Sequence, residues 1–207
     1  MKSNHVIVLI VSATIYAGVA WGAAEPNPVN DSPLARTVQT CGTCHGTNGR
    51  SISPTFPNLA AQTAPYVEAQ LKAFKDQTRA DPDAQAYMWG MAAQLSDAQI
   101  SQLADYFSKQ PAPAAGKSGD PAVIARGKQV FEEGVPARQI PPCASCHGAH
   151  GEGMATFPRL AGQHAPYLFK QILVIQNALR NAPVMHGVVK ELTNDQIQAV
   201  VLYLESI

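Results

Sequence analysis

The chain contains the same unit twice, and this duplication limits its fold more than any other sequence feature. Each copy begins with two cysteines that are separated by two residues, and a histidine follows the second cysteine directly. Phe-Pro-x-Leu-Ala-x-Gln, Ala-Pro-Tyr and a further Gln then follow in the same order. The matched positions are Cys41, Cys44, His45, Phe56, Gln62, Tyr66 and Gln70 in the first copy, and Cys143, Cys146, His147, Phe157, Gln163, Tyr167 and Gln171 in the second. We therefore expect two similar domains.

The segments outside the two copies set the expected domain boundaries. Residues 1–24 have the order of a secretory signal peptide, with Lys2 in a charged start, an apolar run over 6–19 and small residues up to Ala24. The apolar run is shorter than the roughly 20 residues that span a bilayer as a helix. An uncleaved membrane anchor is the alternative interpretation. Residues 113–117 belong to a Pro-, Ala- and Gly-rich linker, so we predict domains over 25–112 and 118–207 and a periplasmic location.

The apolar spacing in both copies is helical, and no segment alternates as a half-buried strand does. We expect a helix ahead of each cysteine pair, over 34–40 and 122–131. A second helix begins at a first-turn proline, and a capping box opens a closing helix. The residues that mark these two helices are Pro65, Ser96 and Gln99 in the first copy and Pro166, Thr193 and Gln196 in the second. The sequence therefore predicts an all-α fold.

The motif Cys-x-x-Cys-His is the attachment signal for c-type haem, because the two thiols form thioethers with haem and the histidine coordinates the iron. It occurs twice and uses every cysteine of the chain. A zinc ribbon would place the second cysteine pair about 15–20 residues after the first, whereas these pairs lie a domain apart. A thioredoxin-like dithiol would need a βαβ pattern, which is absent. We predict two covalently bound haem c groups, with thioethers at Cys41, Cys44, Cys143 and Cys146 and axial iron ligands at His45 and His147.

The sixth iron ligand separates electron carriers from haem enzymes, because a methionine opposite the histidine fills the site and raises the reduction potential. Met88 and Met185 each stand seven residues before a leucine that opens the closing helix. We therefore assign them as the second axial ligands. Met91 is the rival of Met88, and His186, next to Met185, could replace it in a redox-linked or damaged state. Met154 follows its haem motif too closely to reach the other haem face.

Together these motifs resemble the cytochrome c4 family, the dihaem class I cytochromes c made of two fused single-haem domains. The resemblance covers essentially the whole mature chain. It implies two tandem class I cytochrome c domains, each a small helical haem-binding fold whose first and last helices cross beside the haem, with the propionates of the two domains facing each other. The second copy has Gly127 and Phe131 at the expected crossing, whereas the first has Arg36 and Thr40 there.

Arg79 and Arg180 occupy matched places before the two Met loops. Such an arginine can pair with a haem propionate, or it can be a solvated surface residue. The sequence leaves both interpretations open. The roles of the matched Gln62 and Gln163 are also undecided, and the matched Tyr66 is expected mainly to pack behind the proline.

Filled iron sites favour an electron carrier without catalytic activity of its own. It would be soluble or peripherally membrane-bound, and it would take single electrons from a respiratory complex or dehydrogenase to an oxidase or another cytochrome. The alternative is the cytochrome subunit of a periplasmic dehydrogenase complex. Two complete His/Met sets count against a haem enzyme such as a peroxidase. Fifteen basic and fifteen acidic residues leave no positive excess, so nucleic acid is not an expected partner.

Overall fold

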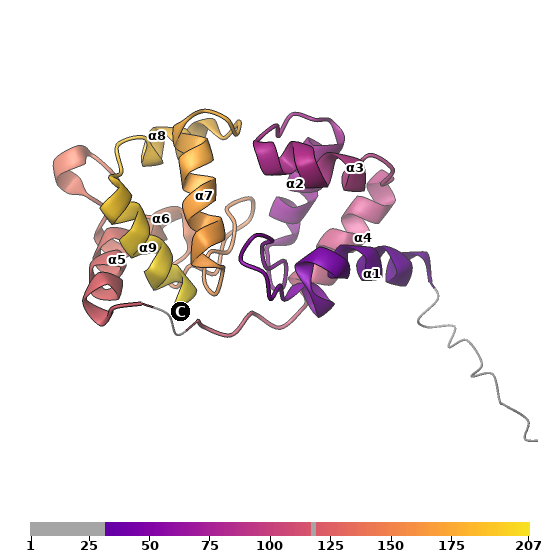
Figure 1. The fold of residues 1–207 in the computed structure, drawn as a ribbon, viewed down its shortest axis with the longest axis horizontal. Coiled ribbons are helices and arrows are strands. Elements are labelled where there is room, and N and C mark those ends of the chain that lie inside the picture. The colour runs from indigo at the N-terminus through magenta and orange to yellow at the C-terminus, as the bar shows by residue number, and fades with distance from the viewer. Residues whose placement is uncertain (1–31, 117–118) are drawn as a thin grey trace, which may run out of the picture.

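The computed structural model describes residues 32–116 and 119–207, so the predicted signal peptide and part of the predicted linker lie outside the described residues. Within the described part, helices alternate with long loops and no helix is long and apolar enough to cross a membrane. Two helical domains lie side by side (Figure 1). The first comprises α1 (Pro33–His45), η1 (Thr47–Gly49), α2 (Ala64–Lys75), η2 (Ala84–Met88), α3 (Trp89–Ala92) and α4 (Asp97–Ser108). The second comprises α5 (Pro121–Glu133), η3 (Pro136–Arg138), α6 (Ala144–His147), α7 (Ala165–Gln176), α8 (Pro183–Val189) and α9 (Asn194–Glu205).

The start signals read from the sequence are the ones the helices use. Proline stands in the first turn of α2 and of α7. Ser96 caps α4 and Thr193 caps α9, each through a complete capping box. The capping boxes satisfy backbone N–H groups that have no partner inside the helix, and the prolines bring no N–H of their own to the first turn.

The haem motif sits differently in the two domains. Helix α1 runs on past the predicted end at Thr40 and includes the whole first motif up to His45. Helix α5 ends at Glu133, and Gly134, whose φ is 71°, caps it. A loop with a Val135–Ile140 bridge then precedes the short helix α6. A Cβ at Gly134 would lie 2.2 Å from the Ile140 carbonyl oxygen, so only glycine fits this turn.

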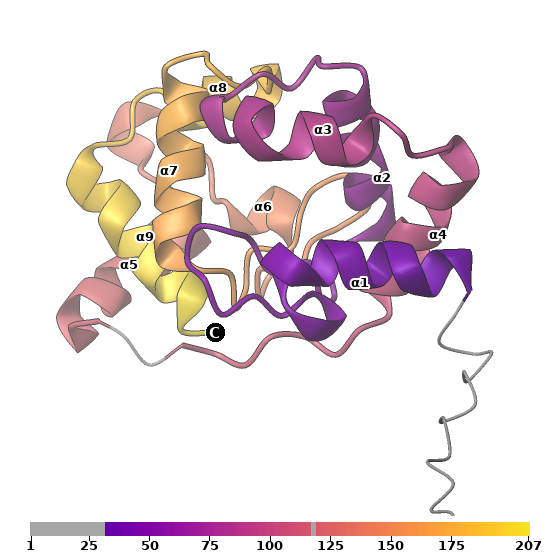
Figure 2. The same cartoon turned by 45° about the vertical axis from the view of Figure 1, so that its right-hand side comes forward.

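The predicted helix crossing forms closely in the second domain. A Cβ on Gly127 would lie 2.0 Å from the Ala199 carbonyl oxygen, so the backbones of α5 and α9 touch there. Phe131 packs beside Tyr203, with ring centroids 5.6 Å apart. In the first domain, α1 has few contacts with α4. The structure describes every residue of α1, and of these His45 alone is buried. Figure 2 shows α1 lying along the lower side of its domain.

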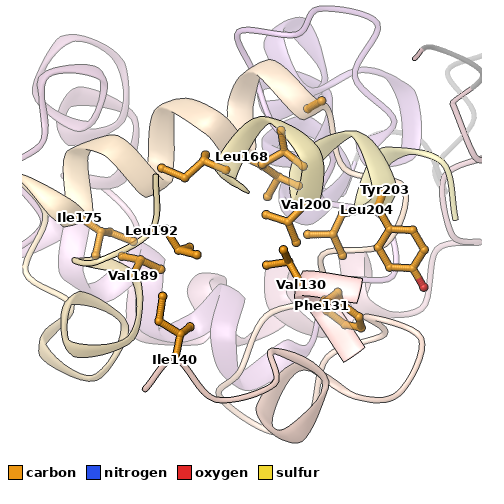
Figure 3. Close-up of a cluster of buried hydrophobic side chains, with 13 residues drawn as sticks. Val130, Phe131, Ile140, Leu168, Ile175, Val189, Leu192, Val200, Tyr203 and Leu204 are labelled. Carbon is orange, nitrogen blue, oxygen red and sulfur yellow. The ribbon is translucent and has the colours of Figure 1, made fainter. Parts of the chain in front are cut away.

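The core of the second domain surrounds an open space. Helices α7, α8 and α9 and the loop after α8 direct apolar side chains towards it (Figure 3). Those that also line the cavity described below are Leu168, Ile175, Val189, Leu192, Val200 and Leu204. The helices of this domain therefore pack around a large internal space as well as against one another.

Candidate functional site

One cavity of about 710 Å³ extends through both domains and across the interface between them. Its lining is mainly apolar. Of the ten residues assigned from the sequence to thioethers, iron ligation or propionate contacts, nine lie on its wall: Cys41, His45, Arg79, Met88, Cys143, Cys146, His147, Arg180 and Met185. Cys44 is the exception, since it is exposed on α1 and does not line the cavity.

The two motif histidines are held in the same way. His45 Nδ1 lies 2.9 Å from the Pro57 carbonyl oxygen, and His147 Nδ1 lies 2.9 Å from that of Pro158. A carbonyl oxygen only accepts hydrogen bonds, so Nδ1 carries the proton and Nε2 keeps a free lone pair. Burial lowers the pKa of both histidines, which keeps the rings neutral. His147 Nε2 is buried without a hydrogen-bond partner, as suits a nitrogen that binds a metal ion.

Two of the cysteines that line the cavity, Cys41 and Cys143, are suited to an uncharged sulfur. Burial raises the pKa of the Cys41 thiol, and it raises that of Cys143 to about 11. The four cysteines form no disulfide among themselves. A thioether carries no charge, so its burial avoids the large cost of burying a thiolate.

The methionines separate into two groups. Met88 and Met185 are partly buried and line the cavity, whereas Met91 and Met154 are 58% and 52% exposed and lie off its wall. Met88 ends the π-helical turn η2, a widened type of turn often found at functional sites. His186 Nδ1 lies 2.8 Å from the Ile175 carbonyl oxygen, and His186 does not line the cavity. The structure therefore places the matched methionines on the cavity wall and their rivals away from it.

Comparison with known proteins gives the family. The family model for cytochrome c matches residues 35–110 and 124–207. The chain is 38% identical over 209 residues to cytochrome c-552 of Acidithiobacillus ferridurans, which covers 100% of this chain and 90% of that protein. It is 32% identical over 215 residues to cytochrome c4 of Stutzerimonas stutzeri, covering 99% of each. The structure of cytochrome c4 from Acidithiobacillus ferrooxidans matches with a TM-score of 0.77 and 41% identity, over 82% of this chain and 99% of that one. The chain belongs to the cytochrome c4 family.

As a cytochrome c4, the chain carries two covalently bound haem c groups and transfers electrons. The fold expected from the resemblance, two tandem cytochrome c domains, is confirmed. The chain is also similar, in part, to proteins whose names refer to thiosulfate dehydrogenase. It is 36% identical over 87 residues to a thiosulfate dehydrogenase electron acceptor of Stutzerimonas stutzeri, covering 40% of that protein. The structure of thiosulfate dehydrogenase TsdBA from Marichromatium purpuratum matches 80% of this chain and 36% of its own, with a TM-score of 0.70 and 27% identity.

In this cytochrome c4 the matched arginines are buried at the domain interface, not solvated on the surface. Arg79 donates to Gln70 of its own domain at 2.8 Å and to Gln171 of the other at 2.9 Å. Arg180 repeats the pattern in reverse, donating to Gln171 at 2.6 Å and to Gln70 at 2.9 Å, and it also donates to the Tyr66 hydroxyl. The arginines therefore place two positive charges on the cavity wall between the domains, where they can pair with negatively charged groups.

A second pair of matched residues links the two domains of this cytochrome c4. The Gln62 side chain accepts from Arg159 N at 2.6 Å and donates to Arg159 O at 3.0 Å. The Gln163 side chain accepts from Asn58 N at 2.9 Å and donates to Asn58 O at 3.0 Å. Each amide thus pairs with one backbone residue of the other domain, and the two pairs are related by the repeat. The role of these glutamines was undecided from the sequence. Their matched positions in the two copies were the one signal for a shared interface.

Proposed function

We propose that this protein is a periplasmic dihaem carrier that takes single electrons from respiratory donors to a terminal acceptor such as an oxidase. The observation that carries this proposal is the placement of two matched His/Met sets on one continuous cavity. An iron with both axial positions filled has no open site for a substrate. Such a protein exchanges electrons without binding a small-molecule substrate.

Each residue has a defined part in the proposed site. Cys41, Cys44, Cys143 and Cys146 would form the thioethers to haem, while His45, Met88, His147 and Met185 would coordinate the two irons. Haem, when bound, supplies an iron that changes between the ferrous and ferric states. The hydrogen bonds from the two histidines to proline carbonyls fix the ring orientation, since such partners set tautomer and ligand basicity. Arg79 and Arg180 are placed to pair with haem propionates.

The location and the domain boundaries belong to the same proposal. The order of residues in 1–24 supports secretion with cleavage after Ala24, and covalent haem attachment at cysteines agrees with a periplasmic protein. We place the domains at 25–112 and 118–207. Arg50 donates to the carbonyl oxygens of Pro111 and Ala112, and Gly116 N donates to the Glu205 carbonyl oxygen. These bonds tie the connecting segment to both domains.

A second candidate role is that of a dedicated electron acceptor for a dehydrogenase. The similarity to thiosulfate dehydrogenase electron acceptors, and to TsdBA, favours this role over other dehydrogenase partnerships. Both roles use the same two haem sites and differ only in the protein that donates the electrons.

The test measures electron exchange directly. The reduced, purified protein is mixed with membranes from its own host, and its reoxidation is followed by absorbance. Rapid reoxidation with poor carbon monoxide binding and negligible peroxidase turnover is the expected result. Rapid stoichiometric carbon monoxide binding by one haem would contradict the carrier role. Thiosulfate with a purified thiosulfate dehydrogenase should reduce the protein quickly only if the second role is correct.

A further inference from the structure

In the first domain, the residue directly after the matched methionine ties the Met loop to its own start. Trp89 follows Met88, and its Nε1 donates to the Arg79 carbonyl oxygen at 2.9 Å. Arg79 precedes the loop and Trp89 ends it, so this bond joins the two ends of residues 80–88. The Arg79 backbone is itself held, because its N–H donates to the Ala73 carbonyl oxygen at 3.1 Å. The Trp89 bond therefore fixes the position at which Met88 enters the cavity wall.

The second domain makes the same kind of bond with a different side chain. His186 follows Met185, and its Nδ1 lies 2.8 Å from the Ile175 carbonyl oxygen, near the end of α7. A carbonyl oxygen only accepts, so Nδ1 is the donor. Gln176 Nε2 donates to the Val189 carbonyl oxygen at 2.7 Å and holds the other end of α8. His186 therefore ties to α7 the part of α8 that carries Met185.

The two rings lie behind the methionines and outside the space that haem would occupy. Trp89 and His186 are both partly buried, and neither lines the cavity, whereas the methionine before each of them does. Each ring therefore acts on its methionine through the backbone that joins them.

Buried apolar side chains contribute little to holding the two Met-bearing turns. The structure describes all seven residues of α8, and of these only Val189 is buried. It also describes all five residues of η2, and of these only Ala84 is buried. Segments with few buried apolar contacts open locally at a low cost in free energy. The ring hydrogen bonds are therefore a large part of what keeps these turns closed.

We propose that Trp89 and His186 are positioning residues: through its ring N–H, each holds the methionine before it against the iron and so keeps small ligands out of the haem site. The inference rests on the haem ligation of the proposed function. Groups that orient a metal ligand from behind commonly change metal binding by about 10–100-fold when they are removed. When a turn opens, the methionine sulfur leaves the iron and a small ligand donates its lone pair to the free position. The iron keeps its oxidation state, and no proton moves.

The experiment measures how fast imidazole replaces the methionine in the full-length ferric holoprotein. At saturating imidazole the rate is that of turn opening, and loss of the weak red absorbance of Met-bound haem reports it. Trp89→Phe keeps an aromatic ring and removes the N–H. His186→Leu removes the ring donor, whereas His186→Asn keeps an N–H near the place of Nδ1.

Two control variants lose a donor or a histidine without touching these bonds. Tyr106→Phe removes an aromatic donor of the first domain, whose hydroxyl donates to Asn48 Oδ1 at 3.0 Å. His150→Leu removes an exposed histidine of the second domain. Both controls should lose the red absorbance at the wild-type rate.

Each test variant should affect one haem. In Trp89→Phe about half of the red absorbance should decay about tenfold faster than in the wild-type protein, and the rest at the wild-type rate. His186→Leu should accelerate the other half, so the double variant should be fast throughout. His186→Asn should decay at the wild-type rate, because the N–H is kept. If His186 served only as a replacement ligand for the iron, the Asn and Leu variants would behave alike.

Two results would overturn the proposal. One is a wild-type rate in Trp89→Phe or in His186→Leu with the red absorbance intact before mixing. The other is equal acceleration in His186→Leu and His186→Asn. If Trp89→Phe does not accumulate, the two His186 variants decide the matter. A wild-type protein without the red absorbance would contradict the methionine ligation of the proposed function and this proposal with it, whereas unchanged rates with the absorbance intact would contradict this proposal alone.

Discussion

The substitution Gly127→Ala tests the close crossing of α5 and α9. An added Cβ would lie 2.0 Å from the Ala199 carbonyl oxygen, whereas ordinary contacts begin at 3.4 Å, so the helices would have to separate by about 1.4 Å, the difference between these distances. Overpacking costs about 1–3 kcal/mol. Because the obstacle here is a backbone atom, which cannot rotate away as a side chain can, we expect a cost of about 3 kcal/mol. Alanine is better than glycine inside a helix by up to about 1 kcal/mol. The net loss should be about 2 kcal/mol.

Thermal unfolding of the ferric holoprotein, followed by circular dichroism, measures this loss. For a domain of this size about 2 kcal/mol lowers the midpoint temperature by roughly 8–16 °C. Gly42→Ala is the matched control, because an added Cβ there meets nothing within 4 Å and Ala144 already occupies the same motif position in the second copy. The control should melt no lower than the wild-type protein. A Gly127→Ala protein that melts at the wild-type temperature would refute the crossing.

Other substitutions test the interface, a helix cap and a loop. Gln163→Ala leaves buried Asn58 backbone groups unpaired, which should lower the denaturant-measured unfolding free energy by about 1–3 kcal/mol. Thr193→Ala removes the N-cap of α9 and should cost about 1 kcal/mol in the same assay, whereas a wild-type value would exclude the cap. Backbone N–H groups lower the pKa of Glu152. Its carboxylate therefore stabilises the fold above the ordinary carboxyl pKa, and this stabilisation is lost as the pH falls through the lowered value. Between about pH 6 and about pH 3 the wild-type protein should thus lose slightly more stability than Glu152→Gln, a small difference because the side chain is exposed.

The sequence was sufficient for the features that depend on local chemistry. Helix starts at Pro65 and Pro166 and the capping boxes could be predicted because a cap is set by a few neighbouring residues. The haem motifs were read directly from the repeat, which also predicts Met88 over Met91 as the ligand. These predictions needed no knowledge of how the domains meet.

Features that depend on the meeting of distant segments could not be predicted. The sequence does not say whether the domains touch, so the pairing of Gln62 and Gln163 with the opposite backbone was out of reach. The buried ion pair of Arg79 with Asp81 gave no signal either, because the second copy has Ala182 at the matched position. The extension of α1 to His45 was also missed. In the second copy Gly134 ends the matching helix before the motif, whereas the first copy has no such residue and its helix continues through the motif.

In the proposed site, each of two haem irons is held by a motif histidine and a repeat-matched methionine. The most direct measurement is the weak red charge-transfer absorbance of Met-bound ferric haem in single Met→Leu variants. Met88→Leu and Met185→Leu should each remove about half of this absorbance, in line with methionine as the axial ligand. Met91→Leu should leave it unchanged. Loss of the first-domain share in Met91→Leu, with Met88→Leu unaffected, would contradict Met88 as the ligand.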